Sequence, residues 1–253
     1  MLGILHFLEI SSNHTVIAFD RRRIGNTSSG SKPYTYQQLA NDTAGLLDAL
    51  KIPKTDVMGF SLGSFIAQAF TISYPEKVNS LIPVASTCGG KDGIDQPPEF
   101  KKLQFDITNK ALNNISVTAE KIKSLNSASL GSGWIKLHPE SLDIPENMTF
   151  QQLKPGLTPE TMNNQNNIGH AWTATSWMGA CDELAKIAKP TLVITGTDGN
   201  YYVPHGNALI LAGNIPAAWL AQIKDAGHAV MNQYPDDIGK ILNTFLATTG
   251  QSS

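Results

Sequence analysis

The sequence predicts an α/β fold in which a mostly parallel sheet carries helices on both faces. Short apolar runs rich in Val, Ile and Phe alternate with longer segments of helical character along most of the chain. Strands that alternate with helices favour parallel pairing through crossover connections. The chain has 253 residues, of which 41% are hydrophobic and 16% charged, as expected for one large globular domain.

The first predicted elements are a strand and a helix. Residues 14–19 form an apolar, β-rich run that predicts a buried strand. Thr35 is followed three residues later by Gln38, which is the pattern of a capping box at the start of a helix. The next strand, at residues 56–60, runs directly into a helix of small residues.

The alternation continues after this helix. Residues 80–85 predict a strand, but Pro83 cannot donate a backbone hydrogen bond, so we expect a local irregularity there. Beyond residue 190 the rhythm returns. The predicted strands are 190–195 and 218–223, and the predicted helices are 207–212 and 235–248.

Residues 88–180 differ from the rest of the chain. Asn, Gln, Ser and Pro are frequent there, strand signals are weak, and Pro159 has the position of a first helical residue. We interpret this stretch as a helical cap inserted into an α/β core formed by residues 1–87 and 181–253. The alternative is a long surface excursion with partial order.

The composition bears on the partners and the location of the protein. A formal net charge of −2 does not favour nucleic acid or an anionic membrane as a partner. No apolar run approaches the roughly 18 residues of a membrane span. The first eight residues lack the basic start and cleavage site of a signal peptide. Because Cys88 and Cys181 are the two cysteines and have no metal-ligand spacing, we expect reduced thiols in a cytoplasmic protein.

One short motif lies between a predicted strand and a predicted helix. Residues 59–63 read Gly-Phe-Ser-Leu-Gly, a Gly-x-Ser-x-Gly pattern that places a serine on a sharp turn after a strand. The two glycines let the strand and the helix approach closely. We therefore expect Ser61 to be a nucleophile and the Leu62 amide, at the helix start, to bind an oxyanion. The alternative is a glycine-rich turn with an inert serine.

A nucleophilic serine needs a base and a group that orients the base. His228 lies between the last predicted strand and the last predicted helix, so it reaches the same edge of the sheet as Ser61. Asp198 follows the preceding strand, where a carboxylate can orient and stabilise the imidazole. The chain order Ser, Asp, His differs from the orders His, Asp, Ser and Asp, His, Ser that two groups of serine proteases have. An aspartate that caps a turn is the alternative for Asp198.

With these residues the sequence resembles the α/β-hydrolase superfamily, particularly its cofactor-free haloperoxidase and esterase-like members with a helical lid. The likeness covers residues 14–86 and the chain from 190 onward. The cap matches the family only in its place in the chain and in its helical character. The stretches that carry it are residues 16–22 with Gly25, 59–64, 74–78, 196–198 with Val203 and Pro204, and 226–228. The resemblance implies the fold and leaves the substrate open.

The chain departs from the family pattern at its front end. The family normally begins with further strands, and a His-Gly loop after the third supplies the second oxyanion donor. Here residues 1–12 resemble the tail of the helix after that loop, so we expect an α/β-hydrolase fold lacking its first strands. The missing third strand would lie between residues 16–19 and 57–60. Its absence predicts either a gap or a shift of the first strand into its place.

Two further departures concern single positions. The family usually has glycine where this chain has Arg23, and a non-glycine residue costs about 1 kcal/mol if φ is positive there. The family acid usually lies at position 199, one residue after Asp198. Asp92 and Asp95, which follow an earlier strand, are therefore the alternative acids.

The resemblance implies hydrolysis of a small carboxylic ester or related acyl substrate through an acyl-enzyme, with no metal or organic cofactor. Loss of one oxyanion donor lowers turnover by a factor of about 100 to 1000. We therefore expect a weakened hydrolase, or one whose cap supplies a substitute donor. The alternatives are a cofactor-free haloperoxidase or perhydrolase that uses the same residues, and a catalytically inactive ligand-binding member. The oligomeric state is not predicted.

Aromatic residues are candidates for lining a substrate pocket under the cap. The alternative is that those of the cap form its own core, and that Phe60 packs behind the sheet. The arginines at 21–23 either attract an acidic substrate or form a solvated loop with Arg22 in a structural ion pair. The pocket candidates are Phe60, Trp134, Trp172 and Trp177, with Met162 and Met178 beside them.

Overall fold

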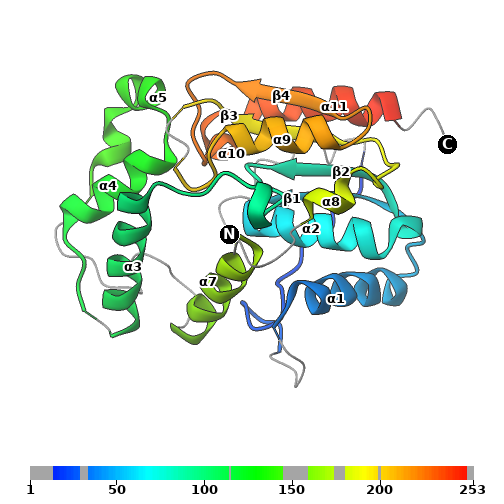
Figure 1. Ribbon diagram of the computed structural model, residues 1–253, viewed down its shortest axis with the longest axis horizontal. Helices are drawn as coiled ribbons and strands as arrows, with labels where there is room; N and C mark the ends of the chain where they lie inside the picture. The colour runs from blue at the N-terminus through cyan, green and yellow to red at the C-terminus, as the bar shows by residue number, and fades with distance from the viewer. Residues whose placement is uncertain are drawn as a thin grey trace.

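A parallel sheet forms the centre of the molecule. The computed structural model describes residues 14–28, 34–113, 115–144, 159–173, 180–198 and 201–249. Within these ranges four strands form one sheet in the order β1-β2-β3-β4, and every neighbouring pair is parallel (Figure 1). The predicted α/β fold is confirmed. The strands are β1 (Thr55–Phe60), β2 (Val78–Val84), β3 (Leu192–Gly196) and β4 (Trp219–Ile223).

Helices connect and cover these strands. Before β3 lie α1 (Tyr36–Ala49), α2 (Leu62–Ser73), η3 (Pro75–Lys77), η4 (Gly90–Asp92), α3 (Pro98–Leu112), α4 (Ala119–Ser129), α5 (Ser132–Leu137), η5 (Pro139–Leu142), α7 (Pro159–Thr173) and α8 (Cys181–Leu184). After β3 lie α9 (Gly206–Asn214), α10 (Val230–Gln233) and α11 (Pro235–Thr249). None of the described helices combines the length and the apolar character needed to cross a bilayer.

The two faces of the sheet build two separate cores. Leu81 and Val193 point into a cluster with α2, α8 and α9, whereas Ile82 and Ile194 point into a cluster with α10 and α11. Successive strand residues face opposite sides, so these adjacent pairs divide between the two layers. The prediction of helices on both faces is therefore confirmed.

Pro83 interrupts the pairing of β2 with β3, as predicted. The Leu81 amide donates to the carbonyl of Pro190, just before β3, at 3.0 Å, and the Ala85 amide donates to the carbonyl of Ile194 in β3 at 2.9 Å. Pro83 occupies the position between them on the same edge and has no N–H to donate. In the described chain β2 and β3 therefore share the Val84–Ile194 pair and a separate bridge at Leu81, while β2 pairs with β1 without this interruption.

The prediction of a buried strand over residues 14–19 was wrong. This segment has no regular structure, and Val16, Ile17 and Phe19 are 43%, 40% and 46% exposed. An apolar run becomes a strand when a neighbour accepts and donates its backbone hydrogen bonds. In the described part of the sheet β1 is the edge strand and does not pair with this segment. The expected shift of this segment into the place beside β1 is therefore not found in the described sheet.

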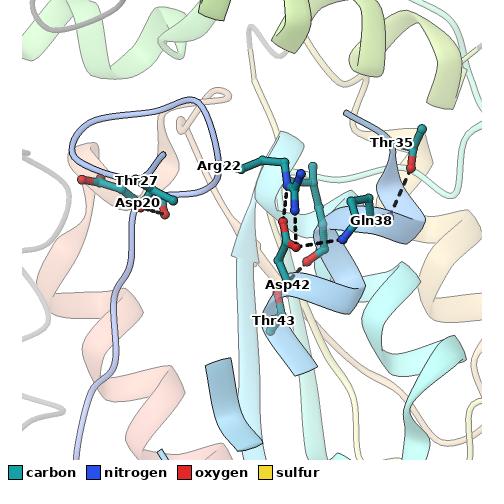
Figure 2. Close-up of polar contacts among 8 residues, drawn as sticks. Asp20, Arg22, Thr27, Thr35, Gln38, Asp42 and Thr43 are labelled. Carbon is teal, nitrogen blue, oxygen red and sulfur yellow. Dashed lines mark hydrogen bonds and ion pairs between the residues drawn. The ribbon is translucent and has the colours of Figure 1, made fainter. Parts of the chain in front are cut away.

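α1 begins where the sequence predicted it. The Gln38 amide donates to Thr35 Oγ1 at 3.2 Å, which is the N-cap bond. The Gln38 side chain donates to Asp42 Oδ1 at 2.9 Å, and Figure 2 shows that Asp42 also accepts from Arg22. Arg22 Nη2 lies 2.6 Å from Oδ1, and Nε bonds Oδ2, so the expected ion pair is confirmed. This bond raises the pKa of Arg22 and ties the loop to α1.

Arg23 has the positive φ for which the family pattern would supply glycine. Its φ is 63°, so the backbone there is left-handed. The Arg23 carbonyl accepts a hydrogen bond from Thr161 Oγ1 at 2.8 Å, and its guanidinium lies 3.6 Å from a Glu160 oxygen. These two contacts attach the arginine loop to α7.

The prediction of reduced cysteines was wrong. Cys88 and Cys181 form a disulfide, and their Cα atoms lie 5.0 Å apart although 93 positions separate them in sequence. The Ala180 amide donates to the Cys88 carbonyl at 2.8 Å beside the bond. The disulfide therefore joins the two ends of the helical segment 88–180. The predicted cytoplasmic location loses the support that it drew from reduced thiols.

Candidate active site

The turn between β1 and α2 holds Ser61 in a conformation that few residues adopt. Ser61 has φ 51° and ψ −120°, and its amide donates to the Val84 carbonyl at 2.9 Å. A Cβ at Gly59 would lie 2.3 Å from the Gly63 carbonyl oxygen, so only glycine permits this close approach of strand and helix. A Cβ at Gly63 would meet no described atom within 4 Å. The steric requirement therefore rests on Gly59.

Leu62 is the first residue of α2. The amides of a first helical turn have no acceptor within their own helix and carry the positive end of its dipole. The Leu62 N–H thus lies next to the Ser61 hydroxyl with a partial positive charge. This placement is compatible with the oxyanion role, which stays a prediction. Residues 1–13, which contain no His-Gly pair, lie outside the described ranges.

The loop after β4 carries His228 and is held from two sides. The Gly227 amide donates to Gln233 Oε1 at 2.9 Å, and the Ala229 amide donates to the Ser129 carbonyl at 3.0 Å. A Cβ at Gly227 would lie 2.3 Å from that same carbonyl oxygen. The end of α4 therefore packs directly against the backbone around His228, and α10 accepts a hydrogen bond from the residue before it.

The imidazole of His228 reaches Ser61. Its Nε2 lies 3.0 Å from Ser61 Oγ, within hydrogen-bonding range. The ring lies between Tyr202, stacked at 4.9 Å, and Phe60, tilted at 5.1 Å. His228 is 7% exposed, and burial lowers its pKa to about 3. The ring is therefore neutral near pH 7, the form in which it can accept a proton.

Asp198 comes close to the His228 loop through its backbone. Its amide donates to the Ala226 carbonyl at 2.9 Å. Its carboxylate turns to α5, where Oδ2 accepts from Ser132 Oγ at 2.7 Å and from the Gly133 amide at 3.3 Å. Nδ1 of His228 is buried and has no hydrogen-bond partner among the described residues. The structure thus brings Ser61 and His228 together and directs the Asp198 side chain to α5.

The alternative acids do not replace Asp198. Both Asp92 and Asp95 are exposed. The Asp95 carboxylate accepts from the Gln96 amide at 2.8 Å and pairs with Lys101. In the described chain neither aspartate bonds the imidazole.

Comparison with known proteins assigns the fold. A family model described as the alpha/beta hydrolase fold matches residues 7–233. The chain belongs to this family. Its relatives and structural neighbours include a depolymerase and an esterase, and the protein is an alpha/beta hydrolase enzyme.

Three similar proteins align with most of this chain. A poly(3-hydroxyalkanoate) depolymerase of Ectopseudomonas oleovorans is 29% identical over 91% of this chain and 74% of its own length. A putative non-heme bromoperoxidase of Mycobacterium tuberculosis is 27% identical over 94% of this chain and 85% of its own. The structure of Est816, titled as an N-acyl homoserine lactone degrading enzyme, is 26% identical with a TM-score of 0.71, covering 96% of this chain and 88% of its own.

The residues predicted to line a pocket lie in different surroundings. Phe60 is 38% exposed and lies against His228. Trp172 is 1% exposed, stacks on Phe65 at 5.2 Å and donates from Nε1 to the Thr87 carbonyl at 3.1 Å, so it belongs to the core. Trp134 stacks on His138 at 4.2 Å. Trp177 lies outside the described residues, as do Met178 and the side chain of Met162.

Sequence reasoning missed two residues that hold His228. Tyr202 stacks on the imidazole, with 4.9 Å between the ring centroids. Gln233 accepts from the amide beside the imidazole. Tyr202 directly precedes a Val-Pro pair that was noted for its family likeness, which was a usable signal. No pattern in the sequence distinguishes Gln233.

A cavity of about 540 Å³ lies beside Asp198, at the junction of α4 and α5 with the loop after β3. It is lined in part by Asp198, Tyr201 and His205, and its walls mix hydroxyl groups with apolar side chains. Ser61 and His228 are not among its lining residues. The remaining lining residues are Pro97, Ser124, Ser127, Ala128, Leu130, Ser132, Ile135 and Pro204.

Proposed function

We propose that this enzyme cleaves a small carboxylic ester or lactone through an acyl-enzyme on Ser61. The observation that carries the proposal is the distance of 3.0 Å from Ser61 Oγ to His228 Nε2. The strained backbone of Ser61 and the neutral state of the buried imidazole add to it. A serine with these properties is an activated nucleophile because its proton has an acceptor within reach.

In the proposed mechanism His228 accepts the Ser61 proton while Oγ attacks the substrate carbonyl. The Leu62 amide stabilises the negative oxygen that forms, and His228 returns the proton to the leaving alcohol. Water activated by His228 then releases the acid. Asp198 is the proposed third member of the triad, and residues 88–180 are the proposed cap over the site.

The substrate class is supported by two relatives. One is a poly(3-hydroxyalkanoate) depolymerase, and another is titled as an N-acyl homoserine lactone degrading enzyme. A polyester and a lactone share the oxygen-ester bond that a neutral serine–histidine pair can attack. We therefore propose an oxygen ester as the scissile bond.

The test compares the intact chain with Ser61→Ala on a short-chain aryl ester. Ser73→Ala is the matched control, because Ser73 lies at the far end of α2 and donates to Gln37 at 3.3 Å. We expect Ser61→Ala to lose activity and Ser73→Ala to retain it. A fluorophosphonate probe should label folded protein at Ser61. Equal ester hydrolysis by Ser61→Ala and the intact chain would refute serine catalysis, and absence of labelling would favour the inactive ligand-binding alternative.

A second candidate is a cofactor-free perhydrolase, which the bromoperoxidase relative at 27% identity favours. In that reaction the acyl group on Ser61 is transferred to peroxide in place of water. Halogenation that requires peroxide, a carboxylic acid and Ser61 would support this candidate. Ester hydrolysis without such halogenation would exclude it.

A further inference from the structure

The hydrogen bonds around His228 leave one ring nitrogen unused. Nε2 lies against Ser61, whereas Nδ1 is buried without a partner in the described chain. When the imidazole accepts a proton at Nε2, both nitrogens become donors, and an acceptor at Nδ1 stabilises that state. A base with an unpaired Nδ1 is therefore weaker than one paired with a carboxylate.

The natural acceptor is adjacent in space. The Asp198 amide donates to the carbonyl of Ala226, which is two residues before His228. A Cβ at Gly196 would lie 2.3 Å from the same carbonyl oxygen, so the end of β3 rests directly on the His228 loop. The backbone at Asp198 is therefore fixed beside the loop that carries His228.

Two donors of α5 hold the carboxylate away from the imidazole. Asp198 Oδ2 accepts from Ser132 Oγ at 2.7 Å and from the Gly133 amide at 3.3 Å. Ser132 is exposed and Asp198 is half-buried, so water weakens and competes for these bonds. A bond from the buried Nδ1 would lie in a less polar environment, where a carboxylate partner is strongly favoured.

The same part of the helical segment contacts both loops. Ser129 accepts from the Ala229 amide, and three residues later Ser132 donates to Asp198. Displacement of α5 would thus release Asp198 at the loop that carries the base. The position of α5 and the hydrogen-bonding of Asp198 are mechanically linked.

We propose that Ser132 is a positioning residue that competes with His228 for the carboxylate of Asp198. When α5 holds Asp198, the serine–histidine pair lacks its acid. When α5 releases it, the carboxylate turns to Nδ1 and completes the relay. This inference rests on the proposed function of Ser61 and His228 and adds to it a control by the helical segment.

The test uses Ser132→Ala, with Ser132→Thr as the conservative variant that keeps the hydroxyl and Ser73→Ala as the distant control. NMR of histidine-labelled protein follows the titration of His228. We expect Ser132→Ala to raise the pKa of His228 by about 1 or more, because a neighbouring carboxylate favours the protonated ring. Ser132→Thr and Ser73→Ala should titrate as the intact chain does. Since Ser132 is exposed, the alanine variant is expected to fold.

Fluorophosphonate labelling of Ser61 gives a second readout. In Ser132→Ala the carboxylate of Asp198 loses the hydrogen bond from the hydroxyl and becomes available to His228 Nδ1. We therefore expect Ser61 to be labelled about tenfold faster in this variant. Asp198→Asn should remove the gain in the Ser132→Ala background, because the gain requires the carboxylate. This non-additive pattern would not arise from a purely structural role of Ser132.

The outcomes separate the two proposals. If Ser61 is labelled but Ser132→Ala matches Ser73→Ala in both readouts, the competition is refuted and the hydrolase proposal stands. A slower rate in Ser132→Ala also refutes the competition. If no variant is labelled at Ser61 while Ser132→Ala raises the pKa of His228, the competition stands and serine catalysis fails.

Discussion

Replacement of both Cys88 and Cys181 by serine removes the covalent link between the two ends of the helical segment. The disulfide closes a loop with a sequence separation of 93 residues. In the chain-entropy treatment a loop of this length destabilises the unfolded state by roughly 4.7 kcal/mol. The Ala180–Cys88 hydrogen bond already holds the two ends together in the folded state, and it stays in the variant. We therefore expect the free energy of unfolding to fall by about 2 to 5 kcal/mol.

This loss translates into a measurable melting shift. For a chain of about 250 residues each kcal/mol corresponds to roughly 2 to 4 °C, so Tm should fall by about 4 to 20 °C. Thermal unfolding followed by circular dichroism, with and without reductant, measures it. The reductant should lower Tm of the intact chain and leave the double variant unchanged.

Peptide mapping under non-reducing conditions provides the independent check, since a peptide pair containing Cys88 and Cys181 should be recovered linked. Two titratable thiols in oxidised, folded protein would refute the bond. An intact chain whose Tm equals that of the double variant, while the linked peptide is present, would refute the entropic reasoning.

Three other substitutions test the site and its supports. Gly59→Ala should destabilise the fold by several kcal/mol or prevent expression, whereas Gly63→Ala should unfold like the intact chain, because a Cβ is obstructed at the first position and unobstructed at the second. Arg23→Gly should be more stable than Arg23→Ala by about 1 kcal/mol in denaturant titration, since both lose the side chain and only glycine favours φ 63°; equal stability would remove the case for strain. The lowered pKa of His228 makes the unfolded state bind the extra proton, so stability is full above pH 6.5 and falls by at most about 5 kcal/mol as pH drops toward 3. His228→Gln should lose this part of the pH dependence, and an identical pH profile would contradict it.

The layers of the fold, and the meeting of two side chains at the ends of strands, follow from patterns within the sequence. The alternation of apolar runs with helical segments predicted the parallel sheet, because side-chain periodicity is a local property of the chain. The same holds for the N-cap at Thr35 and the break at Pro83, which depend on a hydroxyl oxygen and a missing N–H at known positions. Ser61 and His228 could be paired in advance because carboxyl ends of parallel strands meet at one edge.

Contacts between segments that are distant in sequence depend on how the whole chain packs. Residues 14–19 have the composition of a strand, but a strand exists only with a neighbour to bond it, and the described sheet provides none there. Cys88 and Cys181 bond because the helical segment returns to its starting point, which spacing does not encode. Asp198 has the right place in the chain for an acid, yet its partner depends on whether α5 or His228 lies nearer its carboxylate. Which of several competing partners a residue bonds follows from packing across the whole fold, so local sequence patterns do not predict it.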